Sequence, residues 1–68
     1  MYYYRRIRNL REDHDMTQTQ VAEYLGIKQS QYYRYESGAR EIPTHLLVRL
    51  AILYHTTTDY ILELTDKM

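Results

Sequence analysis

The segment TQTQVAEYLGIKQSQYYRYESG, residues 17–38, contains two short helical patterns that meet at Gly26. Thr17 followed by Gln20 forms a capping box, in which each side chain bonds the other residue's backbone N–H, so a helix is expected to begin directly after Thr17. Glycine suits the end of a helix, which places this first helix at about residues 18–25. Its apolar residues recur at helical spacing: Val21, Ala22 and Leu25.

The second pattern, about residues 28–37, has one side for the core and one for solvent. Tyr32, Tyr35 and Glu36 fall on one side of a 3.6-residue helix, and the remaining side is polar, with Gly38 closing the helix. An apolar side fixes a helix on the domain, while a polar side can enter a DNA major groove about 12 Å wide. The segment therefore predicts a helix-turn-helix at about residues 17–38.

Three further helical patterns flank this segment, at about residues 3–13, 43–54 and 59–65. The last of these is expected to have Thr58 as its N-cap. Five helices with short connections and no alternating pattern of strands predict one compact all-α domain over residues 1–68.

Composition excludes several classes of protein. The chain has no cysteine, and no apolar run approaches the roughly 18 residues of a membrane span. We therefore expect a cytoplasmic protein without a membrane association. The net charge is zero, but residues 1–40 hold seven basic and five acidic residues, whereas residues 41–68 hold two basic and four acidic ones. The N-terminal part is thus mildly positive, which is weak support for an anionic partner.

Neither a metal site nor catalysis is expected. His14, His45 and His55 lack the spacing of metal ligands, and no Gly-rich phosphate loop is present. No Ser or Thr has a recognisable base partner in the sequence. We expect neither an enzyme nor a bound cofactor.

Several short motifs, in this order and spacing, resemble the phage repressor and Cro class of helix-turn-helix proteins, the XRE family. The motifs are Ile7–Glu12, Thr17–Gln18, Val21–Ala22, Leu25–Ile27, Tyr35–Arg40, Leu50–Ala51 and Thr58–Tyr60. The resemblance covers nearly the whole chain and implies a five-helix repressor-like domain that binds double-stranded DNA and regulates transcription. It also implies an ion pair between Arg11 and Glu36 that joins the first helix to the third.

Base contacts are expected from the outer face of the helix at about residues 28–37. The N-terminal end of a recognition helix usually meets the base edges. Glutamine can pair with adenine through two hydrogen bonds, and lysine with the O6 and N7 atoms of guanine. Arg34, one turn beyond Ser30, can reach either a guanine or a phosphate. The expected base-contact residues are Lys28, Gln29, Ser30 and Arg34.

Phosphate contacts are expected around this helix. Gln18 lies at the N-terminus of the preceding helix, where free backbone N–H groups suit an anion, and the resemblance implies the same role for it. Arg5, Arg6 and Arg8 are instead expected in solvent. The expected phosphate-contact residues are Thr17, Gln18, Tyr33, Arg40 and Thr44.

One recognition helix contacts few base pairs, so a repressor that reads a two-fold operator is expected to bind as a homodimer. The last helix has more apolar residues than one buried face needs, and we expect Tyr60, Ile61 and Leu64 to form the dimer interface. Two alternatives remain open: an antitoxin that uses this helix to bind a toxin partner, and a helical protein-interaction module with no DNA role.

Overall fold

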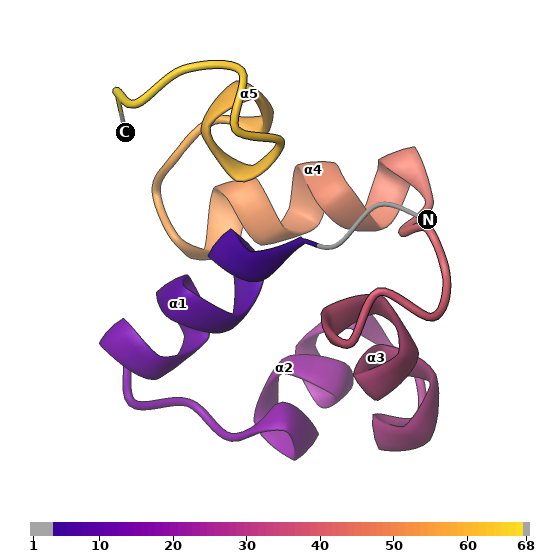
Figure 1. The fold of residues 1–68 in the computed structure, drawn as a ribbon. Coiled ribbons are helices and arrows are strands. Elements are labelled where there is room, and N and C mark those ends of the chain that lie inside the picture. Colours follow the sequence, from indigo (N-terminus) through magenta and orange to yellow (C-terminus); the bar gives the residue numbers. More distant parts are fainter. Residues whose placement is uncertain (1–3, 68) are drawn as a thin grey trace.

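The computed structural model describes residues 4–67, and the elements within that range are all helical (Figure 1). The helices are α1 Arg5–Asp13, α2 Gln18–Leu25, α3 Gln29–Glu36, α4 Thr44–Leu53 and α5 Thr58–Ile61. The all-α fold class is confirmed. No helix in the described range is both long enough and apolar enough to cross a membrane.

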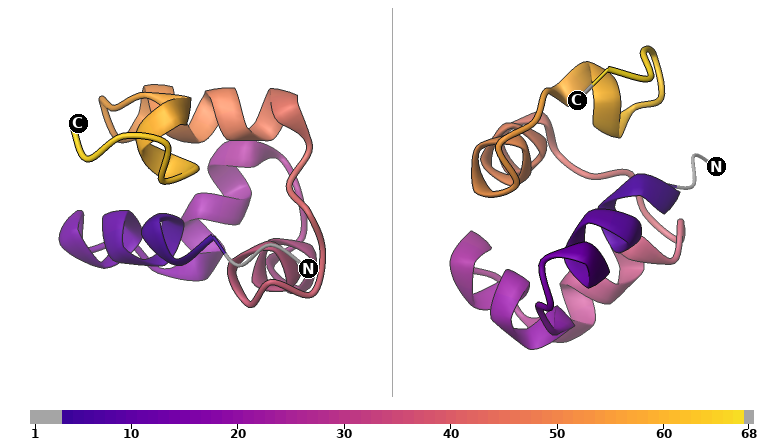
Figure 2. Two further views of the ribbon diagram at one scale, coloured as in Figure 1. Left: turned by 45° about the horizontal axis from the view of Figure 1, so that its top comes forward. Right: turned by 90° about the vertical axis from the view of Figure 1, so that its left-hand side faces the viewer.

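The helices enclose one apolar core. Figures 1 and 2 show α4 and α5 together on one side of the molecule, with α1 and α3 on the other. Every helix contributes at least one buried side chain, and Ile7, Leu50 and Ile61 have no exposed surface at all. The core also buries the rings of Tyr32 and Tyr54, because tyrosine fills the space that phenylalanine, absent from this chain, would otherwise occupy.

Most of the helices end in the same local geometry. After α1, α2, α4 and α5 the chain turns through a residue with positive φ, at Asp15, Gly26, His55 and Glu63 respectively. At the end of α4, for example, the N–H of Thr56 donates to the carbonyl of Ala51 at 2.9 Å, and the N–H of His55 donates to that of Ile52. These are the hydrogen bonds of a Schellman motif, a turn that favours glycine.

The expected helix bounds need correction at the C-terminal end. The sequence predicts the last helix at residues 59–65 with Thr58 as its cap, but Thr57 is the cap, and its hydroxyl accepts the N–H of Tyr60 at 3.0 Å. The helix then ends at Ile61, because Glu63 turns the chain with a φ of 61°. Helices α3 and α4 each begin one residue later than expected, since Lys28 and Pro43 have extended backbones.

Candidate nucleic-acid interface

Helices α2 and α3 form a helix-turn-helix whose turn is fixed by backbone geometry. The capping box at the start of α2 is present, with the Thr17 hydroxyl accepting the N–H of Gln20 at 3.1 Å. At the end of α2, Gly26 has a φ of 74°, and the N–H of Ile27 donates to the carbonyl of Ala22. Only glycine adopts that conformation without steric cost, so Gly26 sets the angle at which α3 leaves the turn.

Helix α3 presents a polar surface to solvent. Lys28 is its N-cap, and the side chains on its outer side are exposed. Tyr33, 54% exposed, is the largest apolar group on that surface. The outward residues are Gln29, Ser30, Tyr33, Arg34 and Ser37. The opposite side of the helix is buried and is formed by Tyr32, Tyr35 and Glu36.

A buried ion pair attaches α3 to α1. The Arg11 guanidinium donates to both oxygens of the Glu36 carboxylate, at 3.0 and 2.9 Å, and Arg11 Nη1 also donates to the carbonyl of Met16. Only 14% of the Arg11 side chain and 5% of the Glu36 side chain are exposed. Arg11 and Glu36 therefore form the pair that the family resemblance implied, and it holds the helix rather than facing a ligand.

Electrostatics keep this pair charged. Burial by itself raises the pKa of Glu36, but polar neighbours, Arg11 foremost through its hydrogen bonds and its charge, outweigh burial, so the pKa lies below its ordinary value. Burial also raises the pKa of the neighbouring Tyr32 hydroxyl, which stays protonated as a result. The ion pair thus remains intact at neutral pH.

Gln18 connects the ion pair to the exposed end of α3. Its amide nitrogen donates to Glu36 Oε1 at 3.3 Å, and its amide oxygen accepts from Gln29 Nε2 at 2.6 Å. A continuous chain of polar contacts therefore runs from Arg11 through Glu36 and Gln18 to Gln29. This chain orients the Gln29 amide before any ligand arrives, which reduces the entropy lost on binding.

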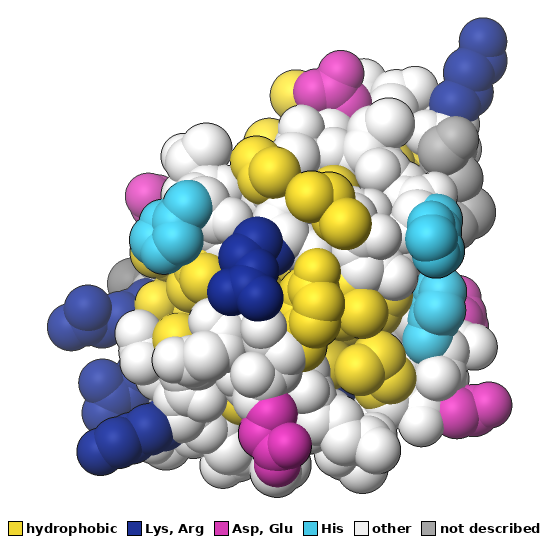
Figure 3. All heavy atoms as spheres, turned by 180° about the vertical axis from the view of Figure 1, so that it is seen from behind, with side chains coloured by type: hydrophobic (Ala, Val, Ile, Leu, Met, Phe, Trp, Pro, Cys, Tyr) yellow, Lys and Arg dark blue, Asp and Glu magenta, His cyan; other side chains and the backbone are white. Residues whose placement is uncertain are grey.

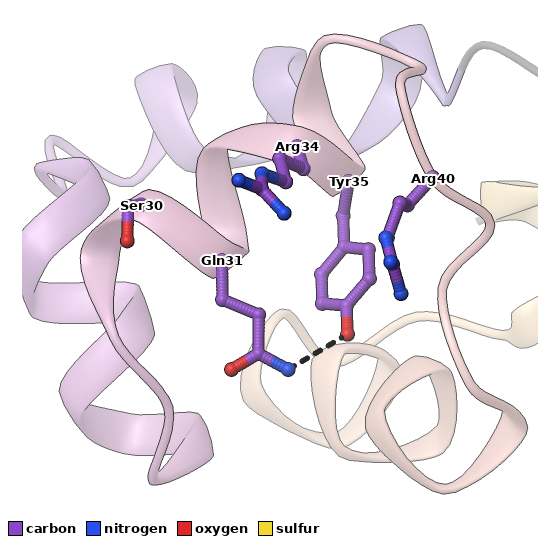
Figure 4. A pocket seen from close by; sticks show the side chains of 5 residues that line it. All are labelled: Ser30, Gln31, Arg34, Tyr35 and Arg40. Carbon is purple, nitrogen blue, oxygen red and sulfur yellow. Dashed lines mark hydrogen bonds between the residues drawn. The ribbon is translucent and has the colours of Figure 1, made fainter.

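Two shallow hollows border α3. One, of about 280 Å³, is lined by Ser30, Gln31, Arg34, Tyr35 and Arg40 (Figure 4). The other, of about 290 Å³, is lined by Arg8, Arg11, Gln18, Tyr33, Glu36 and Ser37. The structure thus brings Gln18 and Tyr33 together at one hollow, and Ser30, Arg34 and Arg40 at the other.

The remaining expected contact residues lie near the surface without sharing these hollows. Lys28 and Gln29 are exposed at the start of α3. Thr17 is exposed but uses its hydroxyl in the capping box, and Thr44 is exposed at the start of α4. Within residues 4–67, no group of His, Asp or Glu side chains is arranged to hold a metal ion.

Sequence reasoning missed a structural role for Arg6. Its guanidinium donates to the carbonyls of Tyr60 and Thr65 and to Asp66, and it lies 4.3 Å from the centre of the Tyr60 ring. Only 16% of the Arg6 side chain is exposed. The expectation that Arg6 is solvated is wrong, because the acidic C-terminal segment folds against the basic start of α1. The opposite charges of these two segments are the sequence feature that could have indicated this contact.

The expected dimer surface also needs correction. Ile61 has no exposed area and belongs to the core of its own protomer, so it cannot contact a second copy. Tyr60 is partly buried against the core, and only Leu64, 73% exposed, projects from the molecule. The last segment has more apolar residues than one buried helix face needs, because Ile61 points into the core while Leu64 lies beyond the end of the helix.

Comparisons with known proteins agree on the family and the fold. Residues 7–61 match the family described as helix-turn-helix. The chain is 47% identical over 64 residues to the "Uncharacterized HTH-type transcriptional regulator YobD" of Bacillus subtilis (strain 168), which covers 94% of the chain. The chain spans 57% of that relative's length. A solved structure of the P22 c2 repressor protein in complex with synthetic operator 9T has a TM-score of 0.79 and 19% identity, and the match covers 90% of this chain and 94% of that one.

Proposed function

The chain belongs to the helix-turn-helix family, of the phage repressor and Cro (XRE) type, and from this we propose that it is a sequence-specific DNA-binding regulator of transcription. The observation that carries the proposal is the polar chain from the buried Arg11–Glu36 pair to Gln29. A helix that merely covers the core does not need polar contacts that orient the side chains at its exposed end. A helix that reads base edges does, because small errors in its position remove hydrogen bonds.

In the proposed mechanism, the N-terminal half of α3 enters the major groove. Lys28, Gln29 and Ser30 lie at that end and face solvent. Gln29 donates one amide hydrogen to Gln18, which leaves its oxygen and its second hydrogen free. Those two atoms form the pair of hydrogen bonds by which glutamine recognises adenine.

Phosphate contacts hold the helix in register. Gln18 and Tyr33 line one hollow beside α3, and Arg40 lines the other. In the proposal, these two sets contact the backbones on the two sides of the groove. Thr17 and Thr44 add exposed groups at the starts of α2 and α4. These contacts supply affinity for any duplex, while the base contacts supply discrimination.

We further propose that the protein acts in the cytoplasm as a repressor and binds a two-fold operator as a homodimer. A dimer places two recognition helices about 34 Å apart and doubles the number of base pairs read. Leu64 is the exposed apolar residue that contacts the second copy in this proposal. Its segment is held in place by the hydrogen bonds of Arg6 to the carbonyls of Tyr60 and Thr65, so the surface is ordered in advance.

A second candidate function is binding to another protein, as a toxin-neutralising antitoxin or a protein-interaction module does. Figure 3 shows one face of the molecule on which hydrophobic side chains gather around a basic side chain. Val48 and Ile52, one turn apart on α4, are 43% and 63% exposed. Such exposure on a surface helix favours a protein partner, which is compatible with DNA binding by α3.

Selection of duplexes from a random library, repeated at several salt concentrations, tests the proposal. We expect a symmetric motif, and affinity that falls steeply as salt rises. Gln29→Ala should relax base preference at one position in each half-site. Thr44→Ala, a change at a proposed phosphate contact, should weaken all duplexes alike. If the protein binds no duplex at low salt, the DNA-binding function is excluded and the protein-interaction alternative remains.

A further inference from the structure

The exposed face of α4 combines apolar side chains with a cation. Val48 and Ile52, one turn apart, are 43% and 63% exposed. His45 and Arg49, also one turn apart, are exposed on the same helix. With 3.6 residues per turn, these four side chains fall within about 100° of one another around the helix axis. They therefore form one surface, which we call the α4 surface.

Contacts with α2 fix the guanidinium of Arg49 on this surface. The guanidinium donates to the carbonyls of Tyr24 and Leu25, the last two residues of α2. Its central carbon also lies 4.8 Å from the centre of the Tyr24 ring. An exposed arginine ordinarily loses side-chain freedom when it binds a partner, and these contacts have already removed part of that freedom. The charge of Arg49 is thus presented at a defined position beside Ile52.

No carboxylate in the described part of the chain neutralises Arg49. Each ion pair among residues 4–67 is formed by an arginine of α1, and none involves Arg49. Helix α4 itself contains neither Asp nor Glu. The bonds to the two α2 carbonyls use two of the five guanidinium N–H groups, so the others can meet an acceptor outside this protomer. The α4 surface is therefore apolar with one unneutralised positive charge.

We propose that the α4 surface binds an amphipathic helix of another protein, which packs apolar residues on Val48 and Ile52 and pairs an Asp or Glu with Arg49. This rests on the second candidate function and names the chemistry of its partner. Apolar side chains one turn apart form a ridge that fits the groove of a second helix, and a carboxylate matches the fork of a guanidinium. A second copy of this chain fits less well. Two α4 surfaces that meet on a two-fold axis bring two Arg49 side chains together without a carboxylate.

The test selects peptides that bind the full chain from a displayed library of random helical peptides. Enriched peptides should share apolar residues at helical spacing with an Asp or Glu beside them. One enriched peptide is then compared with a counterpart in which that acid is replaced by its amide. The amide peptide should bind the wild type about tenfold more weakly, whereas Arg49→Met should bind both peptides equally. A merely structural role of Arg49 would weaken both peptides by the same factor and leave the tenfold difference between them.

Leu64→Asp is the matched control for Ile52→Asp, because each places a charge at an exposed apolar residue. Ile52→Asp should abolish binding of the enriched peptide, and Leu64→Asp should leave it unchanged. Enriched peptides without an acid, or a tenfold preference for the acid that persists in Arg49→Met, would overturn the proposal while a protein-binding surface remains. If the wild type enriches no peptide that Ile52→Asp fails to bind, the protein-binding function of this surface fails as well.

Discussion

Arg11 and Glu36, 25 residues apart in the chain, are joined by two hydrogen bonds of 3.0 and 2.9 Å between one guanidinium and one carboxylate. Arg11 adds a third bond to the carbonyl of Met16, which lies in the turn between α1 and α2. One side chain thereby fixes the positions of α1, the turn and α3 relative to each other. Since α3 carries the proposed base contacts, the pair links the stability of the domain to its function.

Glu36→Ala should destabilise the domain by about 3–5 kcal/mol, because it leaves the Arg11 charge buried without a partner. Chemical denaturation followed by circular dichroism measures the loss. A chain of 68 residues has little stability to spare, so part of the variant should be unfolded at room temperature. Removing both charges with Arg11→Met and Glu36→Leu should cost less than Glu36→Ala alone.

Arg8→Ala is the control for that measurement. It breaks the Arg8–Glu12 pair, whose side chains are 56% and 53% exposed, and should change the free energy of unfolding by less than about 1 kcal/mol. An unchanged denaturant midpoint for Glu36→Ala would show that the buried pair does not hold α3.

The same pair predicts a loss of stability in acid. The pKa of Glu36 is lower in the folded protein than its ordinary value of 4.5, so the folded state favours the charged carboxylate. This contribution is fully present above the unfolded pKa and disappears as the pH falls through the lower, folded pKa. The free energy of unfolding should therefore fall between about pH 5 and about pH 3 more steeply in the wild type than in Glu36→Gln.

Glu12→Gln provides the comparison, because it removes an exposed carboxylate of α1 and leaves the Arg11–Glu36 pair in place. A Glu36→Gln variant with the wild-type slope over this range would mean that other carboxylates account for the acid sensitivity.

The sequence predicted the helices that carry strong local signals. The capping box at Thr17 and the glycine at residue 26 define both ends of α2, and the structure places them there. Local patterns were less informative at the C-terminal end. Thr57 and Thr58 are both good caps, and only the geometry of the turn after α4 selects Thr57.

Most features of the candidate site that could not be predicted from the sequence are contacts between segments far apart in the chain. The local sequence predicts that Arg6 is a solvated helix residue. Its hydrogen bonds to Tyr60, Thr65 and Asp66 form only because α1 and the C-terminal segment lie side by side. The meeting of Arg34 and Arg40 likewise depends on a loop that folds back over the helix it follows. Periodicity identifies which face of a helix is buried, but not which other segment covers it.

Tyr54→Phe should leave the free energy of unfolding unchanged or raise it slightly. The Tyr54 side chain is 2% exposed, and its hydroxyl has no hydrogen-bond partner among residues 4–67. Burial also raises the pKa of that hydroxyl, so it remains neutral. Removing a buried polar group without a partner eliminates a desolvation cost of about 1–3 kcal/mol, which offsets the small loss of packing. A drop of more than about 1 kcal/mol in denaturation would indicate a bridging water at this site.

His55→Gly should stabilise the domain by about 0.5–1 kcal/mol. His55 has a φ of 54° in the turn after α4 and is exposed, so the histidine side chain adds backbone strain without packing. His45→Gly makes the same change at an exposed position in the first turn of α4, where no positive φ is required and glycine should lower the stability. The two thermal midpoints should move in opposite directions, and a fall in both would show that the turn tolerates histidine without strain.

Leu64→Asp should weaken self-association and leave the folded protomer intact. Leu64 is 73% exposed and lies on a segment bound by Arg6, so a charge placed there meets solvent in the monomer but an apolar surface in the proposed dimer. Sedimentation should show a shift towards monomer, and affinity for a two-fold operator should fall while affinity for a single half-site stays constant. Ile52→Asp, at a residue 63% exposed on α4, is the matched variant. If Ile52→Asp dissociates the dimer and Leu64→Asp does not, the two copies meet through α4 rather than through the C-terminal segment.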